Sequence, residues 1–264
     1  MQTDVSIEQP TSTTAGNCGP GRLHFAAFLI SIFLMLIRIG LAQETIPNGA
    51  VLFGRGTFRP GHDVTNFIWN NTTKDLCAQQ ISSVRYAACF SGADFCAKVS
   101  AAITDLPSTG GTVNAMGLEG AQTCASDPFS GVTKSVALLL GHVTVSTSVV
   151  ITVPSSVEIR GSYWLKSIIK ASGALARVLD GRNSTGVVLR DFTVDGNALA
   201  SRGIDLANTV VGTAASNIID HVDVEGTTVY GIDLDNNGDT YLEDTLIRNL
   251  TSGDCVRWVN TGGN

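Results

Sequence analysis

The chain has 264 residues, of which 44% are apolar and 15% are charged, and its formal net charge is −6. This composition excludes a disordered tail, a collagen and a coiled coil, and it supplies a core for one or two domains. The acidic balance argues against nucleic acid as the main partner, because phosphate binding requires a cationic face. The 28 glycines, with plentiful Val, Thr, Asn and Ser, favour strands separated by tight turns.

The first predicted element is an export signal. An apolar run from Leu23 to Ile37 lies between two arginines, and Gly40 and Ala42 then place small residues at both cleavage-recognition positions, which predicts a secretory signal peptide cleaved after Ala42. A retained anchor is the alternative, but the run is shorter than the roughly 20 residues that span a bilayer. Residues 1–42 are therefore interpreted as an N-terminal extension and signal peptide, although an upstream start-site error explains their polar beginning equally well. The mature protein is expected to be secreted, or periplasmic, with no stable membrane span.

The cysteines fit this compartment, because disulfides persist in exported proteins. Cys77, Cys89, Cys96 and Cys124 are expected to form two bridges, in one of three connectivities. Cys255 is then left over, either buried as a small apolar residue or paired with something beyond this chain.

Residues 43–88 are turn-rich without a sustained period and are interpreted as an irregular leader. From Asp94 to Leu106 apolar residues recur at helical spacing and a proline follows, which predicts one amphipathic helix. A glycine turn then leads into a first strand at 112–115. Short β-branched runs closed by Gly, Pro or Ser predict further strands at 135–141, 142–153 and 156–161.

The later strands form a repeat. Residues 189–195 and 219–225 both place apolar side chains at the first, fourth and sixth positions and an acid at the seventh. Residues 242–248 repeat this frame more weakly, with Thr245 at the fourth position. A second strand follows each of these segments, at 204–206, 232–234 and 256–258. Units of about 20–30 residues cannot close their own core and must stack on their neighbours, which favours an all-β parallel β-helix over residues 89–264.

Three phrases carry a family resemblance: FCAKVSAAITDLPSTGGTVNAMGLEGAQTC, VALLLGHVTV and VPSSVEIRGSYWLKSIIKA. They resemble the N-terminal part of the pectate lyase superfamily, which is related to polygalacturonases and rhamnogalacturonases. The resemblance covers roughly residues 90–260. It implies a right-handed parallel β-helix with an N-terminal capping helix, usually secreted and acting on or binding acidic polysaccharides.

The sequence departs from the enzymes of this superfamily in its motifs. The polygalacturonase motifs Asn-Thr-Asp, Asp-Asp, Gly-His-Gly and Arg-Ile-Lys do not occur, and neither the calcium site nor the arginine base of pectate lyases can be placed. Residues 260–264 resemble a turn between coils and no capping element follows them, so we expect a C-terminally truncated member whose further coils lie beyond Asn264.

Superposing the repeats gives two outward columns of charged residues. The first column contains Asp195, Glu225 and Arg248, and the second contains Asp205, Asp233 and Arg257. Carboxylates one rung apart repel, so one holds its proton more tightly, as a general acid beside a general base must in glycoside hydrolysis. The four carboxylates are therefore candidate catalytic residues, and the two arginines candidate substrate-binding residues. The alternative is that the arginines merely neutralise surface acids.

Other residues are weaker candidates. Asp233, Asp235 and Asp239 lie in the oxygen-rich segment 233–240 and could hold Ca²⁺, although a metal-free Asp/Asn/Gly turn is the alternative. Tyr230 and Tyr241 are expected at coil corners, as platforms for a sugar ring.

Two further side chains have simpler expectations. His221 is expected to face outward beside Asp223, as an acid or base or as a plain turn residue. Trp258 is expected to point inward and to pack in the core.

The sequence thus predicts a secreted, carbohydrate-active β-helix protein that hydrolyses or eliminates glycosidic bonds in a uronate-type polysaccharide. The alternative is a non-catalytic extracellular or surface protein that uses the same fold to bind polysaccharide or as a rigid rod, because a fold does not determine activity.

Overall fold

The structure, a computed structural model, describes residues 77, 83–209 and 215–259. The expected signal peptide and most of the expected leader lie outside the described residues. The chain divides into two compact units, residues 1–18 with 79–264, and residues 19–78. All described residues except Cys77 belong to the first unit, and the account below concerns that unit.

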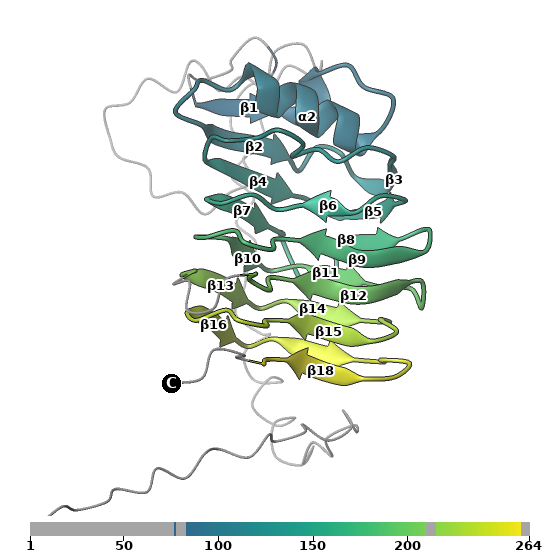
Figure 1. Cartoon of the computed structure of the whole chain (residues 1–264). Coiled ribbons are helices and arrows are strands. Elements are labelled where there is room, and N and C mark those ends of the chain that lie inside the picture. Colours follow the sequence, from purple (N-terminus) through teal and green to yellow (C-terminus); the bar gives the residue numbers. More distant parts are fainter. Residues whose placement is uncertain (1–76, 78–82, 210–214, 260–264) are drawn as a thin grey trace, which may run out of the picture. The chain divides into compact units, whose positions relative to one another are not determined.

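The first unit opens with a strand, a short turn of helix and one α-helix. Strand β1 (Val84–Tyr86) lies in the segment expected to be irregular, and the 3-10 helix η2 (Ala87–Cys89) follows it. Helix α2 (Phe95–Asp105) confirms the predicted helix. The Asp94 side chain caps it by accepting a hydrogen bond from the Ala97 N–H at 2.8 Å. Its apolar face is buried, and α2 packs on β1 and on the two strands that follow it, at the N-terminal end of the sheets (Figure 1).

The remaining described strands are short and follow in chain order. They are β2 (Gly111–Ala115), β3 (Gly120–Cys124), β4 (Val136–Leu140), β5 (Val143–Thr147), β6 (Ile151–Thr152), β7 (Val157–Arg160), β8 (Ser167–Ala171), β9 (Leu175–Asp180), β10 (Val188–Arg190), β11 (Thr193–Asp195), β12 (Ala200–Asp205), β13 (Asn217–Asp220), β14 (Asp223–Glu225), β15 (Tyr230–Asp233), β16 (Thr240–Glu243), β17 (Leu246–Arg248) and β18 (Asp254–Arg257).

These strands form three parallel sheets. Sheet A has the order β1-β2-β4-β7-β10-β13-β16, sheet B the order β17-β14-β11-β8-β5-β3, and sheet C the order β18-β15-β12-β9-β6. From β4 onward each turn of the chain contributes one strand to each sheet, and every recorded pairing between strands is parallel. The structure is therefore a parallel β-solenoid of about seven turns, which confirms the predicted fold class.

The prediction of a single strand at 189–195 is wrong in one respect, because the chain bends within this segment and forms the two strands β10 and β11. Asp191 lies between β10 and β11 with φ of 60°, and His221 and Asp244 occupy the same place in the next two coils with φ of 51° and 42°. Asp, Asn and His tolerate this left-handed conformation better than other residues with a Cβ. A single left-handed residue thus turns each of these three coils from sheet A into sheet B.

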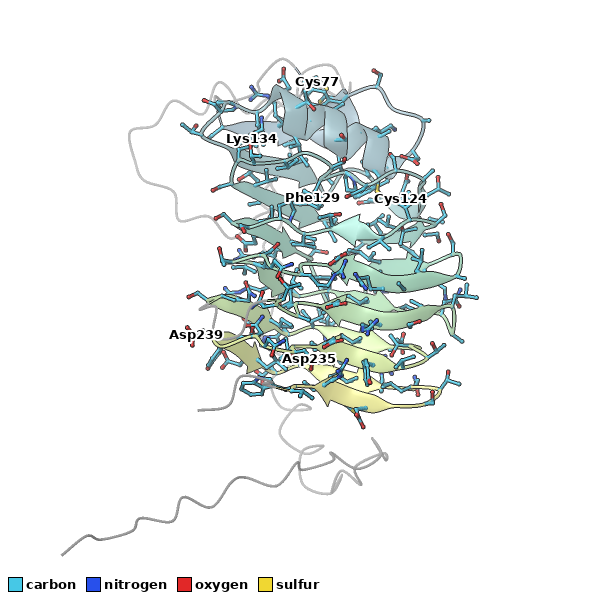
Figure 2. The ribbon with its side chains drawn as sticks, viewed as in Figure 1. Cys77, Cys124, Phe129, Lys134, Asp235 and Asp239 are labelled. Carbon is cyan, nitrogen blue, oxygen red and sulfur yellow. A yellow bond between two sulfur atoms is a disulfide. The ribbon has the colours of Figure 1, made fainter. Side chains whose placement is uncertain are left out.

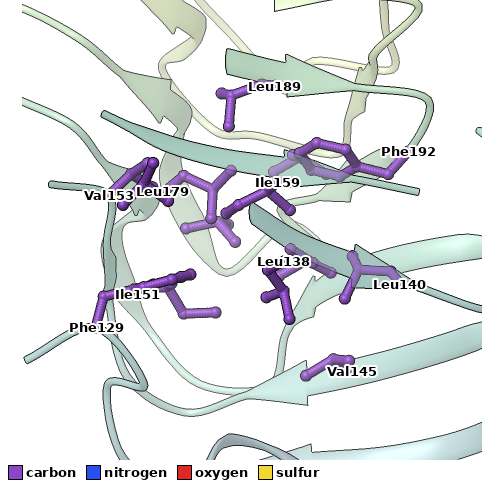
Figure 3. Packing of buried hydrophobic residues seen from close by; sticks show 14 of the residues in the cluster. Phe129, Leu138, Leu140, Val145, Ile151, Val153, Ile159, Leu179, Leu189 and Phe192 are labelled. Atoms are coloured by element: carbon purple, nitrogen blue, oxygen red, sulfur yellow. The ribbon is translucent and has the colours of Figure 1, made fainter. Parts of the chain in front are cut away.

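The core consists of apolar files that run through successive coils. Sheet A aligns Leu138, Ile159, Leu189 and Ile219 in register, each at most 3% exposed (Figure 3). Sheets B and C contribute equivalent files, which contain Val145, Ile169, Val194 and Val224, and Ile151, Leu179, Ile204 and Ile232, respectively. Equivalent side chains therefore stack at the strand spacing of about 4.8 Å.

The predicted file of Phe192, Val222 and Thr245 is also present. The Phe192 carbonyl accepts the N–H of the residue after Val222, and the Val222 carbonyl accepts the N–H of the residue after Thr245. Phe192 and Val222 are fully buried, whereas Thr245 is half-buried. The repeat recognised in the sequence is therefore a real stack of layers.

One disulfide is fully defined within the described residues. Cys96 in α2 and Cys124 at the end of β3 are bonded, with Cα atoms 5.0 Å apart. Cys77, Cys89 and Cys255 are disulfide-bonded as well, so the expectation of a buried, unpaired Cys255 is wrong. Among the described helices, none is both long and apolar enough to cross a membrane.

Candidate functional site

The second predicted column lies on sheet C. Asp205, Asp233 and Arg257 are register partners on β12, β15 and β18. The column begins one coil earlier than the sequence indicated, because Asp180 on β9 is the register partner of Asp205. The missed signal is a short repeat, since β9 and β12 both end in Arg, any residue, an aliphatic residue and Asp.

Arginines link the carboxylates of this column from coil to coil. Arg177 lies 3.0 Å from both Asp180 and Asp205. Arg202 Nε lies 2.8 Å from Asp233 Oδ2 and 3.8 Å from Asp205 Oδ2. The ladder is completed at its two ends by Arg182, which pairs with Asp180, and by Arg257, which pairs with Asp233 and Asp235. We call these residues the sheet C ladder: Arg177, Asp180, Arg182, Arg202, Asp205, Asp233, Asp235 and Arg257.

The pKa values of Asp205 and Asp180, two successive carboxylates of the ladder, shift in opposite directions. Burial raises the pKa of Asp205, and the charge of Asp233 adds to the rise, although Arg177 and Arg202 oppose it. Burial also tends to raise the pKa of Asp180, but hydrogen bonds from Arg182 and Arg177 outweigh it, and that pKa is lowered. The side chains of Asp205 and Asp233 are only 3% and 4% exposed. The arginines of the ladder are therefore more exposed to solvent than these two carboxylates.

Both tyrosines predicted at coil corners lie in strands instead, and each occupies an outward position of its sheet. Tyr230 is in β15, and its ring lies between two guanidinium groups, 5.5 Å from Arg202 Cζ and 5.2 Å from Arg257 Cζ. These distances are within the range of cation–π interactions. Tyr241 is in β16 on sheet A and is 59% exposed.

The first predicted column lies on sheet B. Asp195, Glu225 and Arg248 are register partners, and Lys170 precedes them. Lys170 Nζ lies 2.8 Å from Asp195, and Arg248 Nη2 lies 3.2 Å from Glu225. Arg248 also pairs at 2.7 Å with the fully buried Asp223, and this hydrogen-bonded contact raises the arginine pKa. Cations thus flank both carboxylates of the column.

Two other expectations about single side chains are corrected: His221 faces outward as expected but has other neighbours, and Trp258 is not in the core. His221 pairs with carboxylates other than Asp223: its Nδ1 lies 2.8 Å from Asp220 and its Nε2 3.5 Å from Asp244, whereas Asp223 is fully buried and pairs with Arg248. The hydrogen bond to Asp220 raises the pKa of this exposed imidazole. Trp258 is 61% exposed, because it follows β18, the edge strand of sheet C among the described residues, and no further described coil covers it.

In the segment proposed for calcium, two of the three carboxylates, those of Asp233 and Asp235, are paired with arginines. Arg257 pairs with Asp233 and, at 2.6 Å, with Asp235, which also accepts the Val259 N–H. Asp235 and Asp239 lie at different places along the turn (Figure 2). Within the described residues no group of three His, Cys, Asp or Glu side chains is arranged to hold a metal ion. Calcium binding here stays a prediction, with a guanidinium as its competitor.

No protein-family model matches this chain, and neither a curated protein nor a solved structure is significantly similar to it. The class that the structure itself defines is a parallel β-solenoid whose sheet C carries an outward ladder of alternating arginines and aspartates.

Proposed function

We propose that this chain is an exported β-solenoid of the pectate lyase superfamily that binds an acidic polysaccharide on sheet C. The observation that carries this proposal is the stack of the Arg202 guanidinium, the Tyr230 ring and the Arg257 guanidinium on adjacent strands. Tyr230 is the register partner of Arg202, and Arg257 reaches the same ring from the next strand, so two cations lie beside one aromatic ring.

The Arg202 guanidinium has donors without a partner among the described residues. Arg202 forms its ion pairs through Nε only, and its two Nη atoms make no hydrogen bond among the described residues. The side chains of Arg202 and Arg257 are 25% and 33% exposed. Because a guanidinium fork matches the geometry of a carboxylate, a uronate residue can bind to it through two parallel hydrogen bonds. Asp205 and Asp233 then act as positioning residues that hold the arginines in place.

Binding to polygalacturonate tests the proposal, with a neutral glucan of similar length as the reference ligand. Arg202→Ala should weaken polygalacturonate binding by about 10-fold to 100-fold, because a hydrogen bond to a charged group contributes roughly 1.5–3 kcal/mol. Arg160→Ala is the matched control, since Arg160 is an outward arginine on sheet A that pairs with Glu158. Equal losses for both variants, or binding that Arg202→Ala leaves unchanged, would refute the sheet C site.

A second candidate function is hydrolysis or elimination at the same column. The raised pKa of Asp205 beside Asp233 favours it, because a carboxyl that keeps its proton can serve as a general acid. Release of reducing ends or of unsaturated uronate by the full-length protein, abolished by both Asp205→Asn and Asp233→Asn, would support an enzyme. Binding without release of either product would leave the non-catalytic function.

A further inference from the structure

Two turns of the solenoid contain the acceptor pattern for N-linked glycosylation. Asn183-Ser184-Thr185 follows β9, and Asn249-Leu250-Thr251 follows β17. An Asn, any residue except Pro, and Ser or Thr form the acceptor signal in exported chains. The pattern alone is common, so the folded geometry must decide whether each Asn can carry a glycan.

Asn183 is exposed and its amide is oriented by the next coil. The Asn183 Oδ1 accepts hydrogen bonds from the Thr209 N–H at 2.8 Å and from Thr209 Oγ1 at 2.9 Å. Its Nδ2, the atom that would bear the sugar, donates no hydrogen bond among the described residues. Thr185, the third residue of the acceptor pattern, is exposed as well. A glycan on Nδ2 would therefore displace no contact that stabilises the coil.

Asn249 has a similar setting at another corner. Asn249 is exposed and has φ of 55°. It follows Arg248, the register partner of Glu225, so its equivalent in the preceding coil is Gly226, which has φ of 65°. Its Nδ2 donates one long hydrogen bond, 3.3 Å to Glu225 Oε2, which a singly substituted amide nitrogen can keep through its second hydrogen. Thr251 is also exposed.

We propose that the exported chain carries N-linked oligosaccharides at Asn183 and Asn249. In this transfer the Asn Nδ2 attacks the anomeric carbon of an oligosaccharide linked to a polyprenyl diphosphate. The N–C bond forms, the C–O bond to the diphosphate breaks, and the amide proton is transferred to the departing diphosphate, with no oxidation or reduction. The proposal rests on the export of the chain and not on its binding to polysaccharide.

Both sites adjoin sheet C. The turn of Asn183 leaves sheet C after β9, and the turn of Asn249 enters it before β18. Because both side chains are on the solvent side, glycans there would flank the sheet C ladder without entering the apolar files.

The test is expression of the full-length chain in a eukaryotic secretory host, once with its own N-terminus and once behind a heterologous signal peptide. Treatment of the secreted protein with a peptide N-glycosidase, which hydrolyses the glycan–amide bond and leaves Asp, followed by peptide mass spectrometry, should show conversion at Asn183 and Asn249. Thr185→Ala and Thr251→Ala should each abolish conversion at one site only. Asn197→Gln is the control, because Asn197 is another exposed asparagine with φ of 52° that lies outside any acceptor pattern.

The glycosylation proposal and the predicted native export fail in different ways. A chain that is exported behind the heterologous signal and remains unmodified at both asparagines overturns the glycosylation proposal, and one unmodified site overturns it for that site. A chain that is glycosylated at both sites only behind the heterologous signal supports the sites and refutes the predicted native export.

Discussion

Phe192 provides a direct test of the stacked core. It is fully buried, and its register equivalents are the buried Val222 and the half-buried Thr245. Truncating a buried Phe to Ala costs about 3–5 kcal/mol, because the lost transfer energy adds to the cost of the cavity. In a domain of this size each kcal/mol lowers Tm by about 2–4 °C, so Phe192→Ala should lower it by roughly 6–20 °C.

The assay is thermal unfolding followed by circular dichroism, with disulfides intact. Thr245→Ala is the matched control, because it removes a half-buried methyl and a hydroxyl that donates to the Glu243 carbonyl at 2.9 Å. That change should cost about 1 kcal/mol, the usual net contribution of one hydrogen bond. If Phe192→Ala lowered Tm no more than Thr245→Ala does, the position would not be part of a packed interior file.

Three further predictions concern the charged residues and the disulfide. The raised pKa of Asp205 means that the folded state holds its proton more tightly than the unfolded chain, so its contribution to stability is present below about pH 3.9 and is lost as pH rises through the folded pKa. Raising the pH from about 3 to about 7 should therefore shift the Tm of Asp205→Asn upward relative to wild type and that of Asp180→Asn downward, since the lowered pKa of Asp180 contributes stability that is lost only as pH falls. Shifts of the same sign in both variants would contradict the ladder electrostatics. Replacing Cys96 and Cys124 together by Ser frees a loop of 28 residues and should cost about 3–4 kcal/mol in denaturant unfolding, and a loss below about 1 kcal/mol would count against the bridge. The His221 imidazole should titrate above its usual pKa of 6.5 in an NMR experiment, and a midpoint at or below that value would show that the pairing with a carboxylate is absent in solution.

The sequence was most informative where apolar spacing alone sets the structure. The helical spacing from Phe95 to Ile103 predicted α2, and the in-phase positions of Leu189 and Ile219 predicted the register of β10 and β13. Both patterns follow from which side chains must be buried, so they can be read without coordinates.

The parts that escaped prediction depend on contacts between coils. The left-handed bend at Asp191 repeats at His221 and Asp244 in the next two coils, so it belongs to the stacked turns, and an Asp in the sequence does not by itself specify it. The buried position of Asp223 depends on Arg248 reaching it from the next coil. Sequence periodicity also placed Trp258 inward, because periodicity does not show whether another coil covers the site.

The measurement that most directly tests the in-register stack is a pair of spin-label distances along the outward face of sheet A. Thr112, Ala137, Glu158, Val188, Ile218 and Tyr241 are successive register partners. With about 4.8 Å per rung, labels at Ala137 and Tyr241 should lie about 19 Å apart, and labels at Thr112 and Tyr241 about 24 Å apart. The described native cysteines are disulfide-bonded, so labels go to the engineered thiols. A Thr112–Tyr241 distance that exceeds the Ala137–Tyr241 distance by about 5 Å supports the solenoid. Two distances that do not differ by about one strand spacing would contradict it.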